Sequence, residues 1–415
     1  LPLSPNGKVD RRALPEPEGR ADDKRYRAPR DDLEQQLVQI WEDLLSIRPI
    51  GIEDVFFELG GHSLLAVRLV AEIDKRFGVR LPVGRLFEYP SIAGMANLLR
   101  TNGPMPEASC LVAIRPQGTR PPLFLLPGAG GQVNYLYPFA QQLDAQIPLF
   151  AFQARGVDGQ AAPFGSIEAM AAHYVELMLE RQPQGPYFLA GHSFGGPVAF
   201  EMAQILLIRG HTIGLLAIVD TYAPHTIAGV DNDWIDDDTE LIFVVGQILA
   251  QLFQQEIALS REDLRGLGAG EQIAYFSRRL EEAKLLPEGS GAQLLRCQLE
   301  VYKANLRMHG RYSPQSHRPL PIALFRASEM TPDRSPDPSL PEDWGWGRYC
   351  SQSVPVYYVA GDHHTMITAP HVEGLARRLD GELHARTLPA RTSPIPKVQG
   401  MDAHVVANCS HVTLE

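Results

Sequence analysis

The sequence predicts a multi-domain protein in which a small bundle of helices precedes an α/β domain with a mostly parallel sheet. Between residues 31 and 102, apolar residues recur at helical spacing. From Pro121 onward, short apolar runs bounded by glycine or proline alternate with longer amphipathic stretches, which is typical of parallel strands covered by helices. The length of 415 residues also exceeds what one ordinary core accommodates.

The segments outside these two domains have the composition of linkers. Residues 1–30 combine prolines, glycines and charges that leave too little apolar surface for a core, and we assign 18–30 as a linker. Turn-forming residues gather again between 101 and 120, where we place a second linker at 103–110. Beyond Leu388 the chain shows no periodicity, so residues 389–415 are assigned as a tail without predicted structure.

The first domain, residues 31–102, is predicted to be a small four-helix bundle. Three of its segments carry an apolar face: residues 33–44, the stretch that opens at Ser63, and residues 92–99 after Pro90. Helices with one apolar face must pack against each other to bury it, so we expect a compact helical core.

The second domain is predicted to contain a mostly parallel sheet with a helical insertion. Its expected strands are 123–126, 149–153, 187–190, 215–219, 322–325 and 354–359. Between about 225 and 315 the alternation stops, and only the amphipathic stretches 241–253, 272–280 and 294–306 remain. We expect these helices to cap the sheet.

Composition argues against several classes of function. The net charge of −11 and the pI near 5.7 do not suit a nucleic-acid surface. The four cysteines have no metal-site spacing, and no run of 18 apolar residues or secretory signal is present in the sequence. We expect a reduced, cytoplasmic protein with no metal site and no membrane or nucleic-acid partner.

The tripeptide Gly-His-Ser occurs twice, in surroundings that imply different chemistry. Ser193 lies in Gly191-His192-Ser193-Phe194-Gly195, between an apolar run and a helix-like stretch. This G-x-S-x-G pattern is typical of a sharp strand-to-helix turn that exposes a nucleophilic serine. Ser63 opens a helical pattern and has no glycine two positions on, which indicates a serine at the start of a helix.

A nucleophilic serine requires a base and an acid that orients the base. In this type of fold the chain order is serine, acid, histidine, and the adjacent histidines His363 and His364 follow the last predicted strand. For the acid we prefer Asp220, at the end of the strand 215–219, over Glu329 and Asp333, which follow the next strand.

The oxyanion formed during such a reaction requires hydrogen-bond donors. The backbone N–H of Phe194 is the expected first donor, because it directly follows the nucleophile. The second donor should come from the loop after an early strand. There Gly128 is the best candidate and Ala129 the alternative.

The run Asp54-Val55-Phe56-Phe57-Glu58-Leu59-Gly60-Gly61-His62-Ser63-Leu64 resembles the attachment motif of peptidyl carrier protein domains in nonribosomal peptide synthetases. The resemblance implies that Ser63 carries 4′-phosphopantetheine, added by a separate phosphopantetheinyl transferase, whose thiol holds a peptidyl substrate. A phosphate at a helix N-terminus also meets free N–H groups and a favourable dipole.

Residues 111–388 resemble the type I thioesterase domain of the same synthetases. The matches are Pro127-Gly128, Val219-Asp220-Thr221 and Gly361-Asp362-His363. The resemblance implies an α/β-hydrolase fold with a helical lid at about 225–315 and a triad of Ser193, Asp220 and His363, which leaves His364 at a variable position. Family members often have His-Pro where this chain has Leu126-Pro127, a departure of little consequence if the donor is a backbone N–H.

Residues 1–17 include Leu3-Ser4-Pro5-Asn6-Gly7-Lys8-Val9-Asp10-Arg11, which is similar to the last motif of an adenylation domain. In that family Lys8 would contact the acyl-adenylate. The resemblance implies a fragment of a larger synthetase whose partners are upstream condensation and adenylation domains. Without the rest of that domain we expect no adenylation activity.

Together these resemblances imply terminal chain release: a peptidyl thioester passes from the arm on Ser63 to Ser193, and hydrolysis or macrocyclisation then frees it. One alternative is a stand-alone α/β-hydrolase esterase with an incidental helical domain. Another is a carrier and docking module without catalysis. Labelling by a phosphopantetheinyl transferase separates the esterase from the carrier interpretation.

Overall fold

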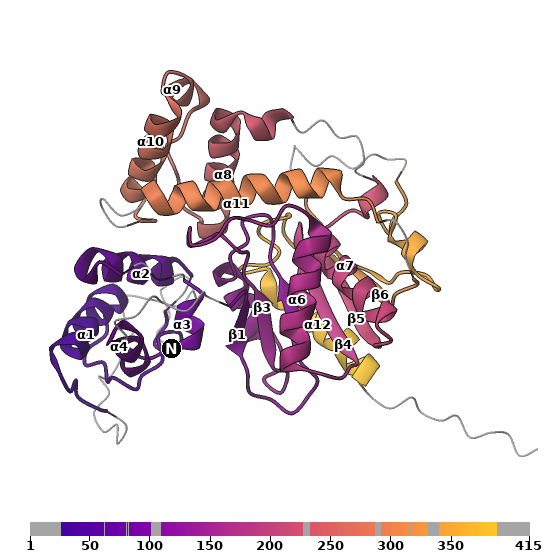
Figure 1. Ribbon diagram of the computed structural model, residues 1–415, viewed down its shortest axis with the longest axis horizontal. Coiled ribbons are helices and arrows are strands. Elements are labelled where there is room, and N and C mark those ends of the chain that lie inside the picture. Colours follow the sequence, from indigo (N-terminus) through magenta and orange to yellow (C-terminus); the bar gives the residue numbers. More distant parts are fainter. Residues whose placement is uncertain are drawn as a thin grey trace, which may run out of the picture.

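The computed structural model describes residues 26–61, 63–79, 81, 83–100, 109–226, 233–286, 292–314, 318–330 and 340–387. A group of N-terminal helices lies beside an α/β domain, and a second group of helices lies over one end of the sheet (Figure 1). The motif with Lys8, the linker residues 103–108 and the tail 389–415 lie outside the described residues.

The N-terminal helices are α1 (Asp32–Leu45), α2 (Ser63–Phe77), α3 (Arg85–Glu88) and α4 (Ile92–Arg100). Their apolar faces converge on a buried core that includes Leu37, Trp41, Phe56, Leu69 and Ile73. The rings of Trp41 and Phe56 meet edge to face, with centroids 5.1 Å apart. Of these elements, only the short helix α3 has no counterpart in the periodic segments of the sequence.

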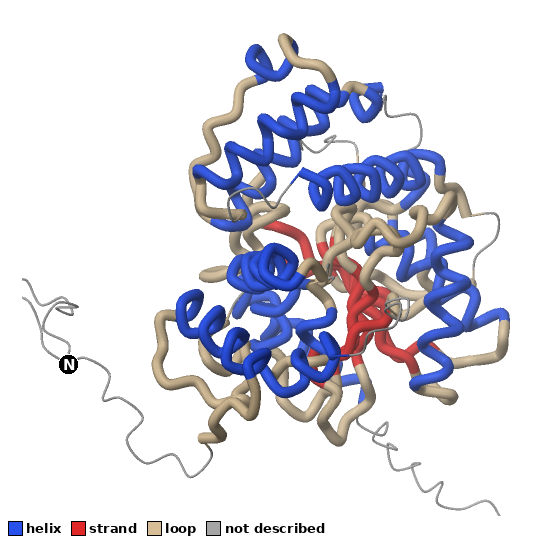
Figure 2. The backbone as a smooth tube through the Cα atoms, turned by 60° about the vertical axis from the view of Figure 1, so that its left-hand side comes forward, coloured by secondary structure: helices blue, strands red, loops and turns tan. Residues whose placement is uncertain are grey.

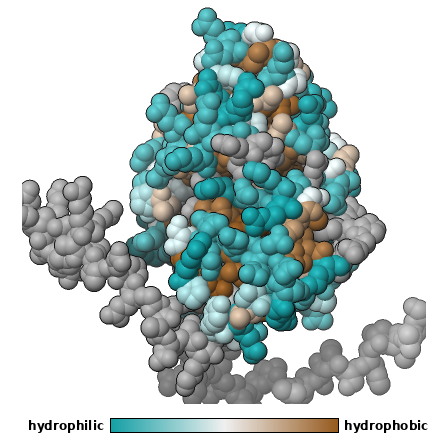
Figure 3. All heavy atoms as spheres, turned by 90° about the vertical axis from the view of Figure 1, so that its left-hand side faces the viewer, coloured by the Kyte–Doolittle hydropathy of each residue, from teal (hydrophilic) through white to brown (hydrophobic). Residues whose placement is uncertain are grey.

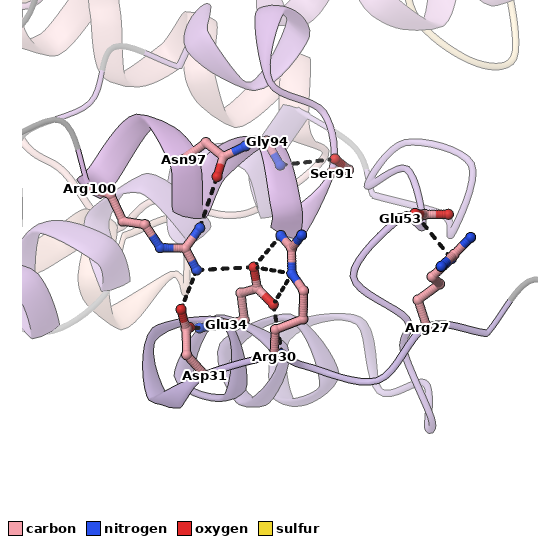
Figure 4. A network of polar contacts seen from close by, with 9 residues as sticks. All are labelled: Arg27, Arg30, Asp31, Glu34, Glu53, Ser91, Gly94, Asn97 and Arg100. Carbon is pink, nitrogen blue, oxygen red and sulfur yellow. Dashed lines mark hydrogen bonds and ion pairs between the residues drawn. The ribbon is translucent and has the colours of Figure 1, made fainter.

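A buried carboxylate ties α1 to α4 (Figure 4). The fully buried Glu34 accepts hydrogen bonds from Arg30 and from Arg100, the last residue of α4. The N–H of Glu34 also donates to the capping side chain of Asp31. The hydrogen bonds from Arg30 outweigh burial and lower the pKa of Glu34 to about 2.

The sheet has seven strands in the order β1-β3-β2-β4-β5-β6-β7. Strand β1 pairs antiparallel with β3, and all other neighbours are parallel. The strands are β1 (Leu111–Arg115), β2 (Leu123–Leu126), β3 (Leu149–Phe152), β4 (Tyr187–His192), β5 (Ile213–Val219), β6 (Ile322–Ala327) and β7 (Val356–Val359). The mostly parallel sheet predicted from the sequence is present, together with the unpredicted antiparallel edge strand β1.

Helices cover both faces of this sheet, which explains why its strands are almost continuously apolar. Helices α6 (Ile167–Arg181) and α7 (Gly195–Ile208) pack on one face, and α5 (Tyr137–Gln142) and α12 (Val372–Thr387) on the other. Side chains alternate between the two cores, so that in β2 Phe124 packs toward α6 and α7 while Leu125 packs toward α12.

Among the described residues, four α-helices lie between β5 and β6 in the chain, where the sequence predicts a helical insertion. They are α8 (Asp238–Phe253), α9 (Arg261–Arg265), α10 (Ala269–Glu282) and α11 (Ala292–Arg311), and they share an apolar core of their own. Figure 1 shows α11 crossing the end of the sheet, with α8 to α10 beyond it.

The N-terminal helices pack against the α/β domain rather than standing apart from it (Figure 2). The ring of Phe57 lies on that of Tyr137, at the start of α5, with a centroid distance of 4.2 Å. Helix α3 lies beside β1, and α2 lies beside the 3-10 turn Asn134–Leu136. Val67 of α2 also packs against the core of the insertion. The outward face on this side is largely hydrophilic with scattered apolar residues (Figure 3).

Candidate active site

Ser193 occupies a tight turn between the end of β4 and the start of α7, as the G-x-S-x-G pattern predicts. Its φ of +53° is a left-handed conformation that a residue with a side chain adopts only under constraint. A Cβ on Gly191 would lie 2.2 Å from the carbonyl oxygen of Gly195, and a Cβ on Gly195 would lie 2.3 Å from that of Leu126. Glycine is therefore required on both sides of the serine.

Two hydrogen bonds hold the backbone of this turn. The N–H of Ser193 donates to the carbonyl of Val219 at 3.0 Å, and the hydroxyl of Thr221 donates to the carbonyl of Ser193 at 2.7 Å. Val219 is the last residue of β5, the strand that neighbours β4, and Thr221 follows it by two residues. The turn is thus fixed by the sheet itself rather than by a flexible loop.

Ser193, His363 and Asp220 form one hydrogen-bonded chain. His363 Nε2 lies 3.0 Å from Ser193 Oγ, and its Nδ1 lies 2.7 Å from Asp220 Oδ2. Asp220 and His363 are buried, while Ser193 is partly exposed. Because a carboxylate can only accept, Nδ1 carries the ring proton and Nε2 accepts from the serine hydroxyl.

The second oxygen of Asp220 is also satisfied. Asp220 Oδ1 accepts the N–H of Ala327 at 2.7 Å, and Asp220 itself has a φ of +53°, which aspartate tolerates better than most residues. The alternative Glu329 is exposed, and its N–H donates to the carbonyl of Gly361. Asp333 lies outside the described residues.

The two adjacent histidines make different contacts in the structure. His364 has its ring edge-on to His363, at a centroid distance of 4.8 Å, and its N–H donates to Asp362. The Asp362 carboxylate also accepts the N–H of Thr365, and these backbone hydrogen bonds fold the loop that carries His363. His363 rather than His364 therefore contacts both Ser193 and Asp220.

The two expected oxyanion donors differ in whether their N–H group already makes a hydrogen bond. Among the described residues no hydrogen bond is made by the N–H of Phe194, the residue after the nucleophile. The N–H of Gly128, in contrast, donates to the hydroxyl of Tyr135 at 2.7 Å. A Cβ built on Gly128 would lie 3.5 Å from Ser193 Cβ, so this loop borders the nucleophile directly.

Three further side chains shape this site and were not predicted from the sequence. Tyr135 binds Gly128, and His192 bridges the Tyr135 hydroxyl and the His363 carbonyl. The buried Asn305 of α11 donates to the carbonyl of Ala129 at 2.8 Å, so a helix of the insertion contacts the oxyanion loop. His192 lies inside the G-x-S-x-G motif and could have been found there, but no sequence pattern points to Tyr135 or Asn305.

One cavity borders this site and a second lies apart from its three hydrogen-bonded residues. A small apolar one beside the expected oxyanion donors is lined in part by Gly128, Phe194 and Asn305. A larger one, of about 360 Å³, lies between the start of α6 and the end of α11, and none of the three residues of the hydrogen-bonded chain lines it.

Ser63 is the first residue of α2, as its sequence context predicts. The first turn of this helix carries no acidic residue, so nothing there opposes an anion at its N-terminus. The side chain of Ser63 is outside the description of the structure.

The family models for two domains match the chain. Residues 121–383, more than half of the chain, match the thioesterase domain, and residues 35–99 match the phosphopantetheine attachment site. The chain belongs to the thioesterase domain family. This membership and the sheet described above confirm the predicted α/β-hydrolase fold of the thioesterase domain, and the second match confirms the predicted carrier segment with its covalent 4′-phosphopantetheine.

Similar proteins are nonribosomal peptide synthetases. The chain is 31% identical over 407 residues to chondramide synthase of Chondromyces crocatus, covering 95% of this chain and 10% of that protein. It is 33% identical over 349 residues to a dimodular nonribosomal peptide synthase of Bacillus subtilis, covering 83% of this chain and 14% of that one. The chain thus spans a small part of the relatives that it matches.

A solved structure shows the same relationship. A four-domain nonribosomal peptide synthetase bound to AMP and glycine aligns with 92% of this chain and 28% of its own, at 30% identity and a TM-score of 0.61. These relatives favour a synthetase thioesterase over a stand-alone esterase.

Neither a metal site nor a membrane span emerges from the described part of the thioesterase chain. Its described residues contain no group of three or more His, Cys, Asp or Glu side chains placed to hold a metal ion. None of the helices in those residues is long and apolar enough to cross a bilayer.

Proposed function

We propose that this chain releases finished peptides at the end of nonribosomal peptide biosynthesis. The observation that carries the proposal is the hydrogen-bonded chain Ser193–His363–Asp220, which lies in a thioesterase domain and follows a phosphopantetheine attachment site in the same chain. Upstream condensation and adenylation domains of the same synthetase would supply the peptide.

In this proposal Ser193 is the nucleophile and His363 the base. The Ser193 hydroxyl gives its proton to His363 Nε2, and Oγ bonds to the acyl carbon of the thioester. When the tetrahedral intermediate collapses, the C–S bond breaks and His363 returns the proton to the leaving thiol. Asp220, 2.7 Å from Nδ1, fixes the tautomer and stabilises the transient imidazolium.

The negative charge of the tetrahedral intermediate falls on the former carbonyl oxygen. We assign the N–H groups of Phe194 and Gly128 as the donors that stabilise it. Both border Ser193, one through the chain and the other through the close approach of the Gly128 loop.

Ser63 is the proposed attachment residue for the phosphopantetheine arm. The backbone N–H groups of the first turn of α2 would face its phosphate, with no acidic side chain in that turn. When bound, the arm supplies a thiol that holds the peptide as a thioester, and a separate phosphopantetheinyl transferase would add it.

The second half-reaction frees the peptide from Ser193. With His363 as base, either water or a nucleophile of the peptide itself attacks the acyl-serine, giving a linear or a cyclic product. We propose that the helices α8 to α11 act as a lid over this step and that the apolar residues of α8 limit the access of water. The hydrogen bond from Asn305 of α11 to the Ala129 carbonyl supports this proposal.

The four N-terminal helices are the proposed carrier bundle, residues 31–102, and the cytoplasm is the proposed location.

One experiment on the full chain tests the assignment of Ser63 as the attachment residue and of Ser193 as the nucleophile. A promiscuous phosphopantetheinyl transferase with coenzyme A should add one arm to the parent and none to Ser63→Ala. A fluorophosphonate should label the parent and not Ser193→Ala. Labelling of the Ser63→Ala chain with the arm would contradict the carrier assignment, and a fluorophosphonate adduct on Ser193→Ala would contradict the nucleophile assignment.

A further inference from the structure

The N–H group assigned above as the second oxyanion donor is already occupied. Gly128 N–H donates to the Tyr135 hydroxyl at 2.7 Å, the length of a strong hydrogen bond. An oxyanion bound to the same N–H would need to lie along the same direction. The tyrosine oxygen therefore stands where the oxyanion is expected.

The direction of the hydrogen bonds around Tyr135 follows from one carbonyl. His192 Nε2 lies 3.0 Å from the carbonyl oxygen of His363, which can only accept, so the proton of His192 is on Nε2. Nδ1 of the neutral ring is then an acceptor, and the Tyr135 hydroxyl, 3.0 Å away, donates to it. Tyr135 thus accepts from Gly128 and donates to His192.

Burial keeps the phenol of Tyr135 in its neutral form, which this arrangement of hydrogen bonds requires. Burial raises the pKa of Tyr135 above its usual range, so that the hydroxyl remains protonated at neutral pH. A protonated hydroxyl that gives its hydrogen to His192 has a lone pair left for Gly128.

The oxyanion loop does not depend on Tyr135 for its shape. Asn305 Nδ2 donates to the carbonyl of Ala129 at 2.8 Å, and the N–H of Gly131 donates to the carbonyl of Gly128 at 2.9 Å. The N–H of Ala154 fixes the end of the loop by donating to the carbonyl of Gly131. Removal of the tyrosine hydroxyl should therefore leave Gly128 in place with its N–H free.

We propose that Tyr135 is a positioning residue that caps the Gly128 donor in the resting enzyme and is displaced by the acyl oxygen when Ser193 is acylated. The proposal rests on the function proposed above. An oxyanion forms a charge-assisted hydrogen bond, about twice as strong as the neutral one to tyrosine, so the exchange is favourable once charge develops. The neutral bond must still be broken, which slows acylation by about fivefold.

The test measures the rate of Ser193 acylation in the full chain. A soluble peptidyl N-acetylcysteamine thioester is mixed with the protein, and the acyl-enzyme is followed by rapid quench and intact mass. Tyr135→Phe should be acylated about fivefold faster than the parent, although the loss of its two hydrogen bonds lowers the melting temperature. Tyr137→Phe, the same change two residues along, should match the parent.

A rate for Tyr135→Phe equal to or below that of the parent would overturn the cap. If Tyr135 only stabilised the fold, the variant would lose melting temperature without a gain in the rate of Ser193 acylation. If neither parent nor variant forms a Ser193 adduct, the proposed function fails and not the cap alone.

A measurement on the unaltered protein covers the case in which Tyr135→Phe does not fold. A boronic acid that bonds to Ser193 creates an anionic oxygen in the oxyanion position. If Gly128 N–H passes from tyrosine to that oxygen, its amide proton should shift downfield in the NMR spectrum. An unchanged Gly128 resonance in a fully formed boronate adduct would contradict the proposal.

Discussion

Asp220 Oδ2 lies 2.7 Å from His363 Nδ1, and both residues are buried. The other oxygen of Asp220 is held by the N–H of Ala327 on the neighbouring strand β6. The acid therefore spans two strands of the sheet and presents one oxygen to the histidine in a fixed direction.

This geometry predicts that Asp220→Asn abolishes most activity without unfolding the protein. An asparagine can present its N–H₂ group to His363 and hold the wrong tautomer, for which a loss of about 10⁴-fold in kcat is expected. The measurement is thioester hydrolysis by the full chain, with Glu329→Gln as the control. A large loss in Glu329→Gln with a small one in Asp220→Asn would assign the acid to the later position.

The turn that carries Ser193 should not tolerate a side chain at Gly195. A Cβ there would lie 2.3 Å from a backbone oxygen of β2, and that oxygen cannot move without distorting the sheet. We expect Gly195→Ala to lower the free energy of unfolding by several kcal/mol, or to prevent folding.

The matched control for that change is Gly381→Ala. Gly381 lies within α12, and a Cβ on it would meet no atom within 4 Å. Alanine should stabilise the helix by about 1 kcal/mol, measured by urea unfolding. Equal effects of the two substitutions would show that the turn is not under the steric constraint described.

The Glu34 network should make the carrier helices sensitive to acid. Its pKa is lowered to about 2 from an ordinary 4.5, so its contribution to stability is complete above pH 4.5 and is lost as the pH falls toward 2. The shift corresponds to at most about 3 kcal/mol, and exposure of the partner arginines reduces it.

We therefore expect Glu34→Gln to destabilise α1 and α4 more at pH 7 than at pH 3. Urea unfolding followed through the amide resonances of these two helices measures the difference. Glu53→Gln, which removes the exposed ion pair with Arg27, should change little at either pH. A Glu34→Gln effect that is the same at both pH values would contradict the lowered pKa.

The proposed lid makes a prediction about products. Val244 and Ile248 lie one turn apart on α8, are partly exposed, and belong to none of the apolar clusters formed by the described residues. Replacing both with serine should admit water to the acyl-serine and raise the ratio of linear to cyclic product from a thioester with an internal amine. Gln247→Ala, which replaces a polar side chain on the same face of α8, is the control. An unchanged ratio in the double variant would count against the lid.

The fold could be predicted from the sequence wherever periodicity was strong. The run 123–126 predicted β2 with its bounds, because a strand buried on both faces is apolar throughout. The edge strand β1 was missed, since it lies among turn-forming residues that predict a linker. The short helices α3 and α9 were missed because four or five residues show no period.

The candidate site was predictable where chain order and motif determine position. The G-x-S-x-G pattern marks Ser193, and the ends of two predicted strands mark Asp220 and His363. The structure brings these three side chains together. Tyr135 carries none, because its contact with Gly128 depends on how a 3-10 turn packs beside the oxyanion loop.

The relay from Ser63 to Ser193 can be followed directly through the transfer of one peptidyl group within the full chain. A promiscuous phosphopantetheinyl transferase and a peptidyl-coenzyme A load the parent, Ser63→Ala and Ser193→Ala, and intact mass is recorded over time. The parent should gain the mass of the peptidyl-phosphopantetheine and then lose the peptidyl part alone. Ser193→Ala should retain the full added mass, and Ser63→Ala should never gain it. Loss of the peptidyl group from Ser193→Ala at the rate of the parent would contradict the relay.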